Sequence, residues 1–335
     1  MMDTQDFVID RKKAVAVTVL ERMYEAKEFS ALVPLLLQQE EIYPNAEVQL
    51  LLGKCHYYGN GEKQNYNAAV TWFTLAAEEG NAEAAYHLSM MYLDGLGVIK
   101  DDTKACSWLE AAANKGFGQA QYELSMRYYS GHGVEEDAVV AHSWCEKAAR
   151  SGYREAQHDL GWEYSFGLEG IIDYDKAIYW FSLSANQGDD DSQSILGELH
   201  ADMGDLAQSF CWYKKAAEHG NAKAQRCIGD YYREGRGVEQ DYDQALYWYQ
   251  KAADQKNAQS MTKLGKMYAE GKGVEQDNHQ AFLLYEEAAE QGDVGGQYAL
   301  GYAYRHGLGV EKDRKQAKQW DKIGRKNELS QMFGW

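Results

Sequence analysis

Apolar and small residues recur along this chain with the spacing of paired amphipathic helices. In the segment that starts at residue 222 they occupy the third, seventh, eighth and eleventh positions, which share one face of a helix. After Asp241 a second run follows, in which Ala245, Trp248, Ala252 and Ala253 again have helical spacing. The pattern predicts two short helices joined by a loop.

The same two-helix pattern returns many times. "YYREGRGVEQDYDQALYWYQKAAD" (231–254) matches "MYAEGKGVEQDNHQAFLLYEEAAE" (267–290) and "RYYSGHGVEEDAVVAHSWCEKAAR" (127–150) position for position. A repeat of this length is typical of stacked two-helix units. Seven of the eight units have a 36-residue period and the fifth is four residues shorter: 46–81, 82–117, 118–153, 154–189, 190–221, 222–257, 258–293 and 294–329.

The Gly-x-Gly loop in "GRGVEQDYDQA" (235–245) could hold a phosphate or a metal, or could simply join two helices. Because the Gly-x-Gly is copied along the chain at fixed spacing, it is interpreted as a structural joint. Asp241 and its equivalents come directly before the second helix, where a carboxylate caps free N–H groups. A calcium loop would need more oxygen ligands than this loop offers.

Two positions in each unit indicate how the helices pack. The eighth residue is Gly or Ser in every unit, which predicts that two helices approach closely there. A tryptophan recurs at the centre of the second helix in seven units, and we expect it to belong to the core: Trp72, Trp108, Trp144, Trp180, Trp212, Trp248 and Trp320.

Composition narrows the classes of partner. The chain has 335 residues with 34 basic and 52 acidic side chains, a net charge of −18. Such a chain repels phosphate backbones and anionic lipids, so we expect no nucleic-acid or membrane partner, and a basic partner would be attracted. No apolar run reaches the length of a membrane-spanning helix, and the first ten residues are acidic, unlike a secretory signal. These features predict a cytoplasmic protein.

No residue pattern indicates catalysis. The nine histidines lie at scattered unit positions, and none of the common hydrolase or nucleotide-binding motifs occurs. The five cysteines include no Cys-x-x-Cys pair, which disfavours a disulfide framework and a zinc ribbon. We therefore predict no catalytic residue, no metal site and no cofactor.

The repeated motif is Ala-x-Ala-Gln-x-x-Leu-Gly-x-x-Tyr, then Gly-x-Gly-Val-x-x-Asp, then Ala-x-x-Trp and Ala-Ala-x-x-Gly. From residue 46 to about 325 it resembles the Sel-one-like repeat family, which is related to tetratricopeptide repeats. The resemblance implies an all-α fold, a right-handed superhelical α-solenoid that serves as an interaction scaffold. The flanking residues 1–45 and 330–335 are then an N-terminal helical pair that caps the solenoid and a C-terminal tail.

By analogy with tetratricopeptide repeats, unit positions 2, 5, 9, 12 and 13 face the concave side of the solenoid. In the first to fourth units these positions are rich in aromatic residues and methionine, which suit recognition of a peptide or an amphipathic helix. The alternative is that these side chains pack between neighbouring helices. The predicted partner-binding residues are Tyr86, Met90, Leu93, Tyr122, Met126, Tyr129, His158, Trp162 and Phe166.

The main functional prediction is a non-catalytic adaptor that holds a segment of another protein in this concave groove. One alternative, suggested by bacterial members of the family, is an immunity or antitoxin protein that neutralises a basic toxin. Self-association through the aromatic residues is a further possibility. A beta-lactam-binding enzyme is a remote alternative, because that secreted branch of the family carries a cysteine pair in each unit and no unit here has two cysteines.

Overall fold

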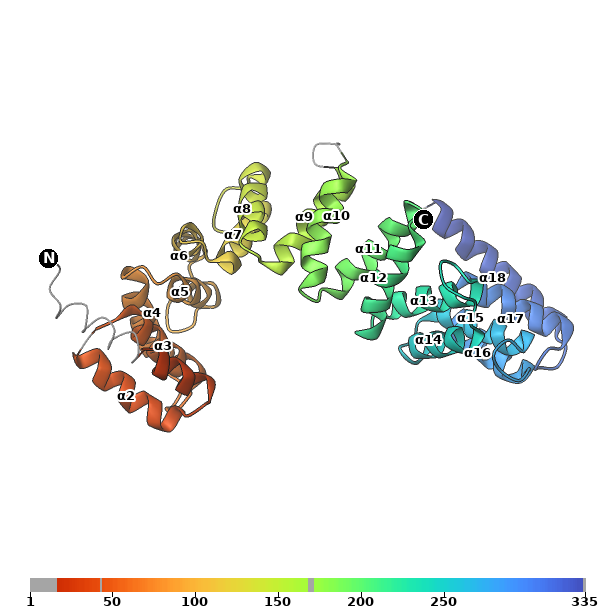
Figure 1. Cartoon of the computed structure of the whole chain (residues 1–335), viewed down its shortest axis with the longest axis horizontal. Helices are drawn as coiled ribbons and strands as arrows, with labels where there is room; N and C mark the ends of the chain where they lie inside the picture. The colour runs from red at the N-terminus through yellow and green to blue at the C-terminus, as the bar shows by residue number, and fades with distance from the viewer. Residues whose placement is uncertain (1–16, 43, 168–171, 334–335) are drawn as a thin grey trace. The chain divides into compact units, whose positions relative to one another are not determined.

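The computed structural model describes residues 17–42, 44–167 and 172–333, and it divides the chain into two compact units, residues 1–172 and 173–335. Every regular element in these described residues is a helix, which confirms the all-α prediction (Figure 1). The first unit contains a helix over residues 17–25 and then α2 (Phe29–Ile42), α3 (Ala46–Tyr58), α4 (Tyr66–Glu78), α5 (Ala82–Asp94), α6 (Asp102–Asn114), α7 (Gly118–Ser130), α8 (Ala138–Arg150) and α9 (Arg154–Phe166).

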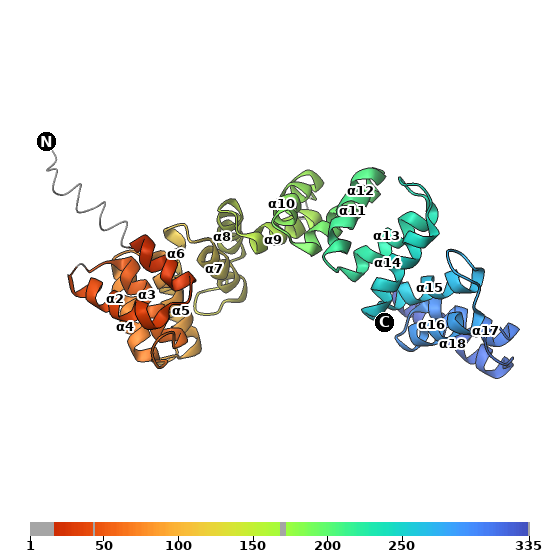
Figure 2. The same ribbon diagram turned by 60° about the horizontal axis from the view of Figure 1, so that its bottom comes forward.

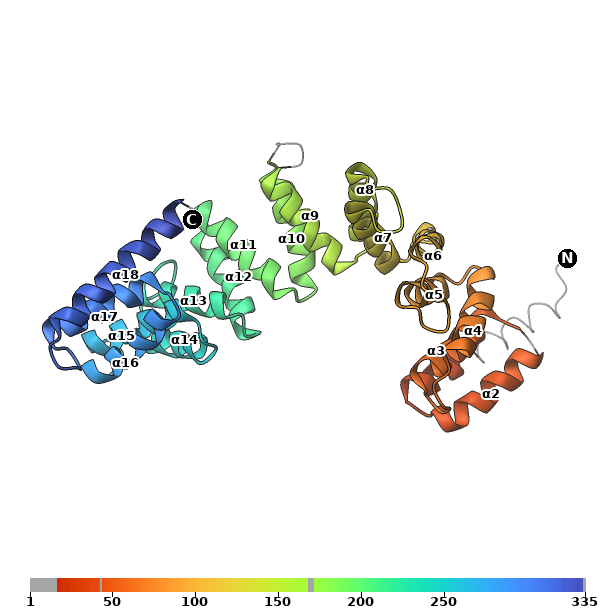
Figure 3. The same ribbon diagram turned by 180° about the vertical axis from the view of Figure 1, so that it is seen from behind.

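The second unit begins with α10 and ends with α18, the longest of the described helices (Figure 2). Its helices are α10 (Tyr174–Asn186), α11 (Asp190–Asp202), α12 (Leu206–Glu218), α13 (Ala222–Glu234), α14 (Tyr242–Asp254), α15 (Ala258–Glu270), α16 (Asn278–Glu290), α17 (Val294–His306) and α18 (Arg314–Phe333). Within each unit a helix packs mainly on the helices that precede and follow it, as the view from behind shows (Figure 3). This pairing of successive helices is the solenoid arrangement that the repeats predict.

The Gly-x-Gly loop has a structural explanation at both glycines. Gly235 ends α13 in the left-handed conformation (φ 67°), which a residue without a side chain adopts without strain. The second glycine lies against the start of the second helix in the preceding repeat. At Gly273 a Cβ atom would come within 2.7 Å of the carbonyl oxygen of Tyr242. The loop thus joins neighbouring repeats, and each glycine serves a different purpose.

In five of the eight repeats a buried glutamine connects the repeat to the one before it. Gln225 Nε2 donates a hydrogen bond to the carbonyl oxygen of Ala217, 3.1 Å away at the end of the preceding helix. The same carbonyl also accepts a backbone hydrogen bond from Gly220 N–H at 3.1 Å, so the glutamine adds a second hydrogen bond at the helix end and links it to the next repeat. Gln121, Gln157, Gln193 and Gln297 make the same contact. The glutamine of the repeated motif is therefore a structural residue.

The deepest core residue of the second helix is not the tryptophan. Trp144, Trp180 and Trp248 are buried, but the other four tryptophans of the series are only half-buried. In six of the seven repeats the residue that follows the tryptophan lies deeper: Phe73, Leu109, Cys145, Phe181, Tyr213 and Tyr249. The expected core position was therefore wrong by one residue in three repeats, those of Trp72, Trp108 and Trp212, because adjacent residues on a helix point in directions that differ by 100°.

The small residue at the eighth position packs against this deeper residue. A Cβ atom on Gly229 would lie 2.5 Å from the ring of Tyr249, and one on Gly197 would lie 2.7 Å from the ring of Tyr213. Where the deeper residue is Leu109 instead, the eighth position is Ser89, which is buried. A glycine on the first helix is thus paired with an aromatic ring on the second helix, and a serine is paired with the smaller leucine.

At the C-terminus α18 extends through residue 333, so most of the segment predicted as a tail is helical, and residues 334–335 lie outside the described residues. Among the described helices, none combines the length and the apolar character required to cross a membrane.

Candidate partner-binding site

An apolar groove lies between the third and fourth repeats, where α7, the start of α8 and the end of α9 meet. It is lined by Tyr129, Ala138, Trp162, Glu163, Phe166 and Gly167, has a volume of about 440 Å³, and is called the aromatic groove below. All of these residues belong to the first compact unit. Three of them, Tyr129, Trp162 and Phe166, were predicted from the sequence as partner-binding residues.

The two largest rings of the aromatic groove are stacked on each other. Trp162 and Phe166 lie one turn apart on α9, and their rings are nearly parallel with centroids 5.2 Å apart. The indole N–H of Trp162 also donates a hydrogen bond to Nε2 of His158 at 3.0 Å, which orients the ring. Phe166 is 75% exposed and Trp162 is 37% exposed, so both present apolar surface to solvent.

Tyrosine–carboxylate hydrogen bonds connect α7 to α9. The Tyr122 hydroxyl donates to Asp159 Oδ2 at 2.7 Å, and the Tyr129 hydroxyl donates to Glu163 Oε1. Burial, together with the acceptor carboxylate, raises the pKa of both hydroxyls well above the usual range. Burial also raises the pKa of Asp159, although the Tyr122 hydrogen bond opposes this shift. The tyrosines therefore remain neutral donors that hold the two helices together.

Not every predicted residue faces solvent. Tyr86 and Leu93 are buried, at 9% and 7% exposure, so the prediction that they line an open surface was wrong. Tyr86 packs in the core, where its hydroxyl accepts a hydrogen bond from Gln119 Nε2 at 2.7 Å and burial raises its pKa to about 12. Here the alternative of packing between helices holds.

The remaining predicted residues lie in intermediate positions. Met90, Tyr122 and His158 are half-buried, whereas Met126 is exposed on α7. Met90 packs against the core cluster around Leu109 and Trp144. The structure thus brings Tyr129, Trp162 and Phe166 together with Glu163, a carboxylate that sequence reasoning did not select.

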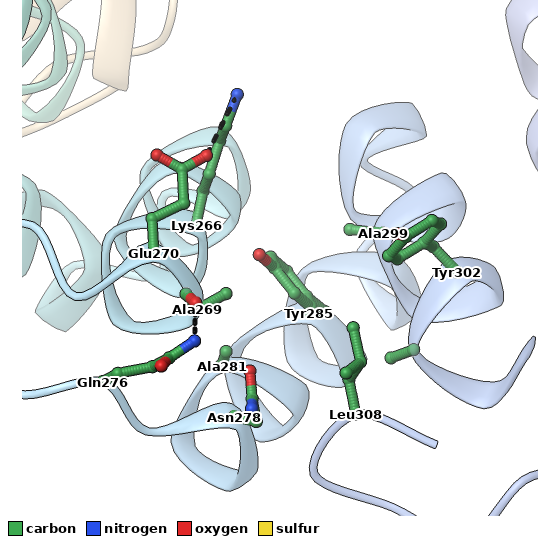
Figure 4. Close-up of a pocket in the computed structure, with 11 residues that line it drawn as sticks. Lys266, Ala269, Glu270, Gln276, Asn278, Ala281, Tyr285, Ala299, Tyr302 and Leu308 are labelled. Carbon is green, nitrogen blue, oxygen red and sulfur yellow. Dashed lines mark hydrogen bonds and ion pairs between the residues drawn. The ribbon is translucent and has the colours of Figure 1, made fainter. Parts of the chain in front are cut away.

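A second pocket, which sequence reasoning missed, lies between α15 and α17 in the second compact unit. Figure 4 shows the side chains that line it, with Tyr285 of α16 pointing its hydroxyl toward the side where Lys266 and Glu270 lie. The volume is about 480 Å³. Small residues at Ala269 and Ala303 leave this space open. Burial raises the pKa of Tyr285 to about 12, so its hydroxyl is a neutral donor.

In the preceding repeat the equivalent tyrosine has two hydrogen-bond partners. There the Tyr249 hydroxyl donates to Asp230 Oδ1 at 2.6 Å and accepts from Arg233 Nε at 3.1 Å. Thirty-six residues later, Lys266 and Ala269 replace Asp230 and Arg233. Among the described residues, none forms a hydrogen bond with the Tyr285 hydroxyl. Comparing successive repeats residue by residue could have revealed this pocket from the sequence.

In the described part of the chain, no group of three or more His, Cys, Asp or Glu side chains is arranged to hold a metal ion. The cysteines there are free thiols: Cys55, Cys106 and Cys145 are buried, Cys227 is partly buried and Cys211 is exposed.

Comparison with family models finds the Sel1 repeat eight times, at residues 46–81, 82–117, 118–153, 154–189, 196–221, 222–257, 258–293 and 294–320. Among curated proteins, the human "Protein sel-1 homolog 2" is 33% identical over 93 residues, and the rat protein of the same name is 34% identical over 93 residues. These matches cover 28% of this chain but only 12% of each of those proteins.

Two solved bacterial structures resemble nearly the whole chain. One is c5321, described as a protective antigen of uropathogenic Escherichia coli with an SLR fold, with a TM-score of 0.72 and 32% identity over 90% of this chain and 67% of that one. The other is a Sel1 repeat protein from Oxalobacter formigenes, with a TM-score of 0.61 and 27% identity over 93% of this chain and 90% of that one.

Proposed function

Because this chain belongs to the Sel1 repeat family, we propose that it is a non-catalytic scaffold that holds a segment of a partner protein in the aromatic groove. Sel1 repeats generally form protein-interaction scaffolds rather than enzymes. The proposal adds a place on the molecule where the partner is held and the residues that contact it.

The exposed stacked pair Trp162–Phe166 is the observation that carries the proposal. Large aromatic side chains that lie in a concavity are the residue type that most often anchors a protein interface. These two rings are not needed to fill the core, because Leu160 on the same helix is fully buried and makes the core contact there. The tyrosine–carboxylate hydrogen bonds between α7 and α9 hold the two helices in place, so the groove is formed before a partner binds.

Peptides selected from a phage-displayed random library against the full chain test this proposal. We expect selected peptides to bind the wild-type protein and to lose about tenfold or more in affinity to Trp162→Ala or Phe166→Ala, measured by calorimetry, because an anchor truncated to alanine typically costs about 2 kcal/mol. Tyr247→Ala removes another exposed ring, in the second unit, and should leave the affinity unchanged.

Two further measurements separate binding from folding. Trp162→Ala should retain the helical circular-dichroism signal and the thermal midpoint, because the side chain lies at the surface. Lys266→Ala in the second unit should affect binding to the aromatic groove little. If the selected peptides bind Trp162→Ala and Phe166→Ala as tightly as the wild type, the aromatic groove is not the binding site and the proposal fails.

A further inference from the structure

We propose that the aromatic groove accepts an arginine side chain of a basic partner segment. This inference rests on the proposed function and specifies the chemistry of the ligand at that same site. It depends on three observations: the ring faces, a carboxylate in the same groove, and the local excess of negative charge.

The ring faces provide a stacking surface. Because Trp162 and Phe166 lie nearly parallel, with an angle of 12° between their planes, a planar guanidinium can extend the stack. A cation over an aromatic face is attracted by the electron density of the ring, and Trp is the strongest of the aromatic residues in this respect. The exposed Phe166 ring leaves room for such a group at the mouth of the groove.

Glu163 places a carboxylate within the same groove. Its Oε1 accepts from the Tyr129 hydroxyl, and its Oε2 lies 2.7 Å from Nδ1 of His142. These two contacts fix the carboxylate, but each oxygen has two lone pairs, so both can accept a further hydrogen bond. A guanidinium presents parallel N–H donors that match the two oxygens of a carboxylate, which lysine cannot do.

The charge around the groove favours a cation. Residues 118–167 contain eight acidic and four basic side chains, a net charge of −4, in a chain whose total is −18. The basic residue of α7, Arg127, lines a different pocket together with Asp94 and Asp102. Glu163 is the charged residue among those that line the groove. A basic segment is therefore attracted both by the chain as a whole and by the groove itself.

A matched pair of small probes tests the inference directly on the full chain. N-acetyl-arginine amide and N-acetyl-citrulline amide have nearly the same shape, but only the first carries a charge. In ligand-observed NMR titrations we expect the arginine probe to bind at least about fivefold more tightly, as cation–π and ion-pair contributions at an exposed site imply. We also expect this difference to shrink as sodium chloride is raised from about 50 to 300 mM.

Variants locate the binding. Glu163→Gln keeps the size of the side chain and removes its charge, and Phe166→Ala removes an exposed ring, so each should reduce arginine binding about fivefold or more. Controls remove an exposed acid and an exposed ring elsewhere: Glu239→Gln and Tyr247→Ala should bind arginine as the wild type does. Because Phe166 is at the surface, its variant remains informative even if Glu163→Gln disturbs the Tyr129 contact.

Three outcomes overturn the inference. The arginine probe does not bind, the citrulline probe binds as tightly as the arginine probe, or Glu163→Gln and Phe166→Ala both bind the arginine probe as tightly as the wild type does. Failure here is distinguishable from failure of the proposed function. If library peptides depend on Trp162 and Phe166 but contain no arginine that contributes to affinity, the scaffold function stands and the arginine inference is wrong. If selected peptides require an arginine and lose affinity to Glu163→Gln, both are supported.

Discussion

At the scale of single residues, two tyrosines in equivalent positions of successive repeats have different surroundings. The hydroxyl of Tyr249 bonds both Asp230 and Arg233, whereas that of Tyr285 opens into the pocket between α15 and α17. Since a hydrogen bond to a charged group contributes about 1.5–3 kcal/mol, Tyr249→Phe should lower the free energy of unfolding by about that amount. Tyr285→Phe should change it by less than about 0.5 kcal/mol.

Urea unfolding of both variants beside the wild type measures this difference, with the slope of the transition checked for constancy. If both variants lose the same free energy of unfolding, the hydrogen bonds of the Tyr249 hydroxyl with Asp230 and Arg233 do not stabilise the fold.

A second residue-scale prediction concerns pH. The His87 ring, whose Nε2 lies 3.7 Å from Glu83 Oε1, and Lys54, whose Nζ lies 2.6 Å from the same oxygen, lower the pKa of Glu83 from 4.5 to about 2. Because the pKa is lower in the folded state, Glu83 stabilises the fold fully above about pH 4.5, and this contribution disappears as the pH falls toward 2. Thermal midpoints measured across this range should therefore depend less on pH in Glu83→Gln than in the wild type.

The exposed acid Glu239 supplies the control for this measurement. Glu239→Gln should keep the pH dependence of the wild type. A Glu83→Gln profile that is parallel to the wild-type profile would mean that the contacts with His87 and Lys54 do not contribute to acid stability.

At the scale of helix pairs, packing outweighs intrinsic helix preference. Alanine is the better helix former by about 1 kcal/mol, yet Gly229→Ala should destabilise the protein by about 1–3 kcal/mol, because the added Cβ would meet the Tyr249 ring at 2.5 Å. Adding Tyr249→Leu should relieve that clash, since Ser89 and Leu109 form the smaller version of the same contact.

A double-mutant cycle on Gly229 and Tyr249, measured by chemical unfolding, tests this compensation. We expect the double variant to be more stable than the sum of the single effects predicts, by about 1 kcal/mol. Strict additivity would mean that the pairing of small and large residues across the two helices has no energetic basis.

At the scale of the whole molecule, stability should be local. Within each compact unit a helix packs mainly on its neighbours in sequence, so we expect a defect in one repeat to affect distant repeats little. Trp144→Ala, which removes a buried ring, should cost about 3–5 kcal/mol and increase hydrogen exchange first in α7 and α8. Trp162→Ala removes a ring of the same size from the surface and should leave exchange nearly unchanged.

Hydrogen exchange followed by mass spectrometry resolves these regions. Uniform loss of protection across the chain in Trp144→Ala would contradict the local model. Strong loss of protection in Trp162→Ala would place that ring in the core and remove the basis of the aromatic groove.

The sequence alone determined the features that depend on local chemistry. The period of the apolar residues predicted the paired helices, and the glycines and aspartates marked where these helices end and begin. Such signals are readable because capping and left-handed backbone conformations involve residues that are close in sequence. The spacing of Trp162 and Phe166 also predicted that they share one face of a helix, and the structure stacks their rings on each other.

Only the tertiary structure decided which of several similar residues are accessible. Tyr86 occupies the same unit position as Tyr122 and His158, yet it is buried while they are half-buried, because contacts from the adjoining repeat cover it. Glu163 is recognised as a residue of the aromatic groove only from its contacts with Tyr129 and His142, which lie in the preceding repeat. Helical spacing specifies the direction of a side chain, but its burial depends on the size and position of neighbours that are distant in sequence.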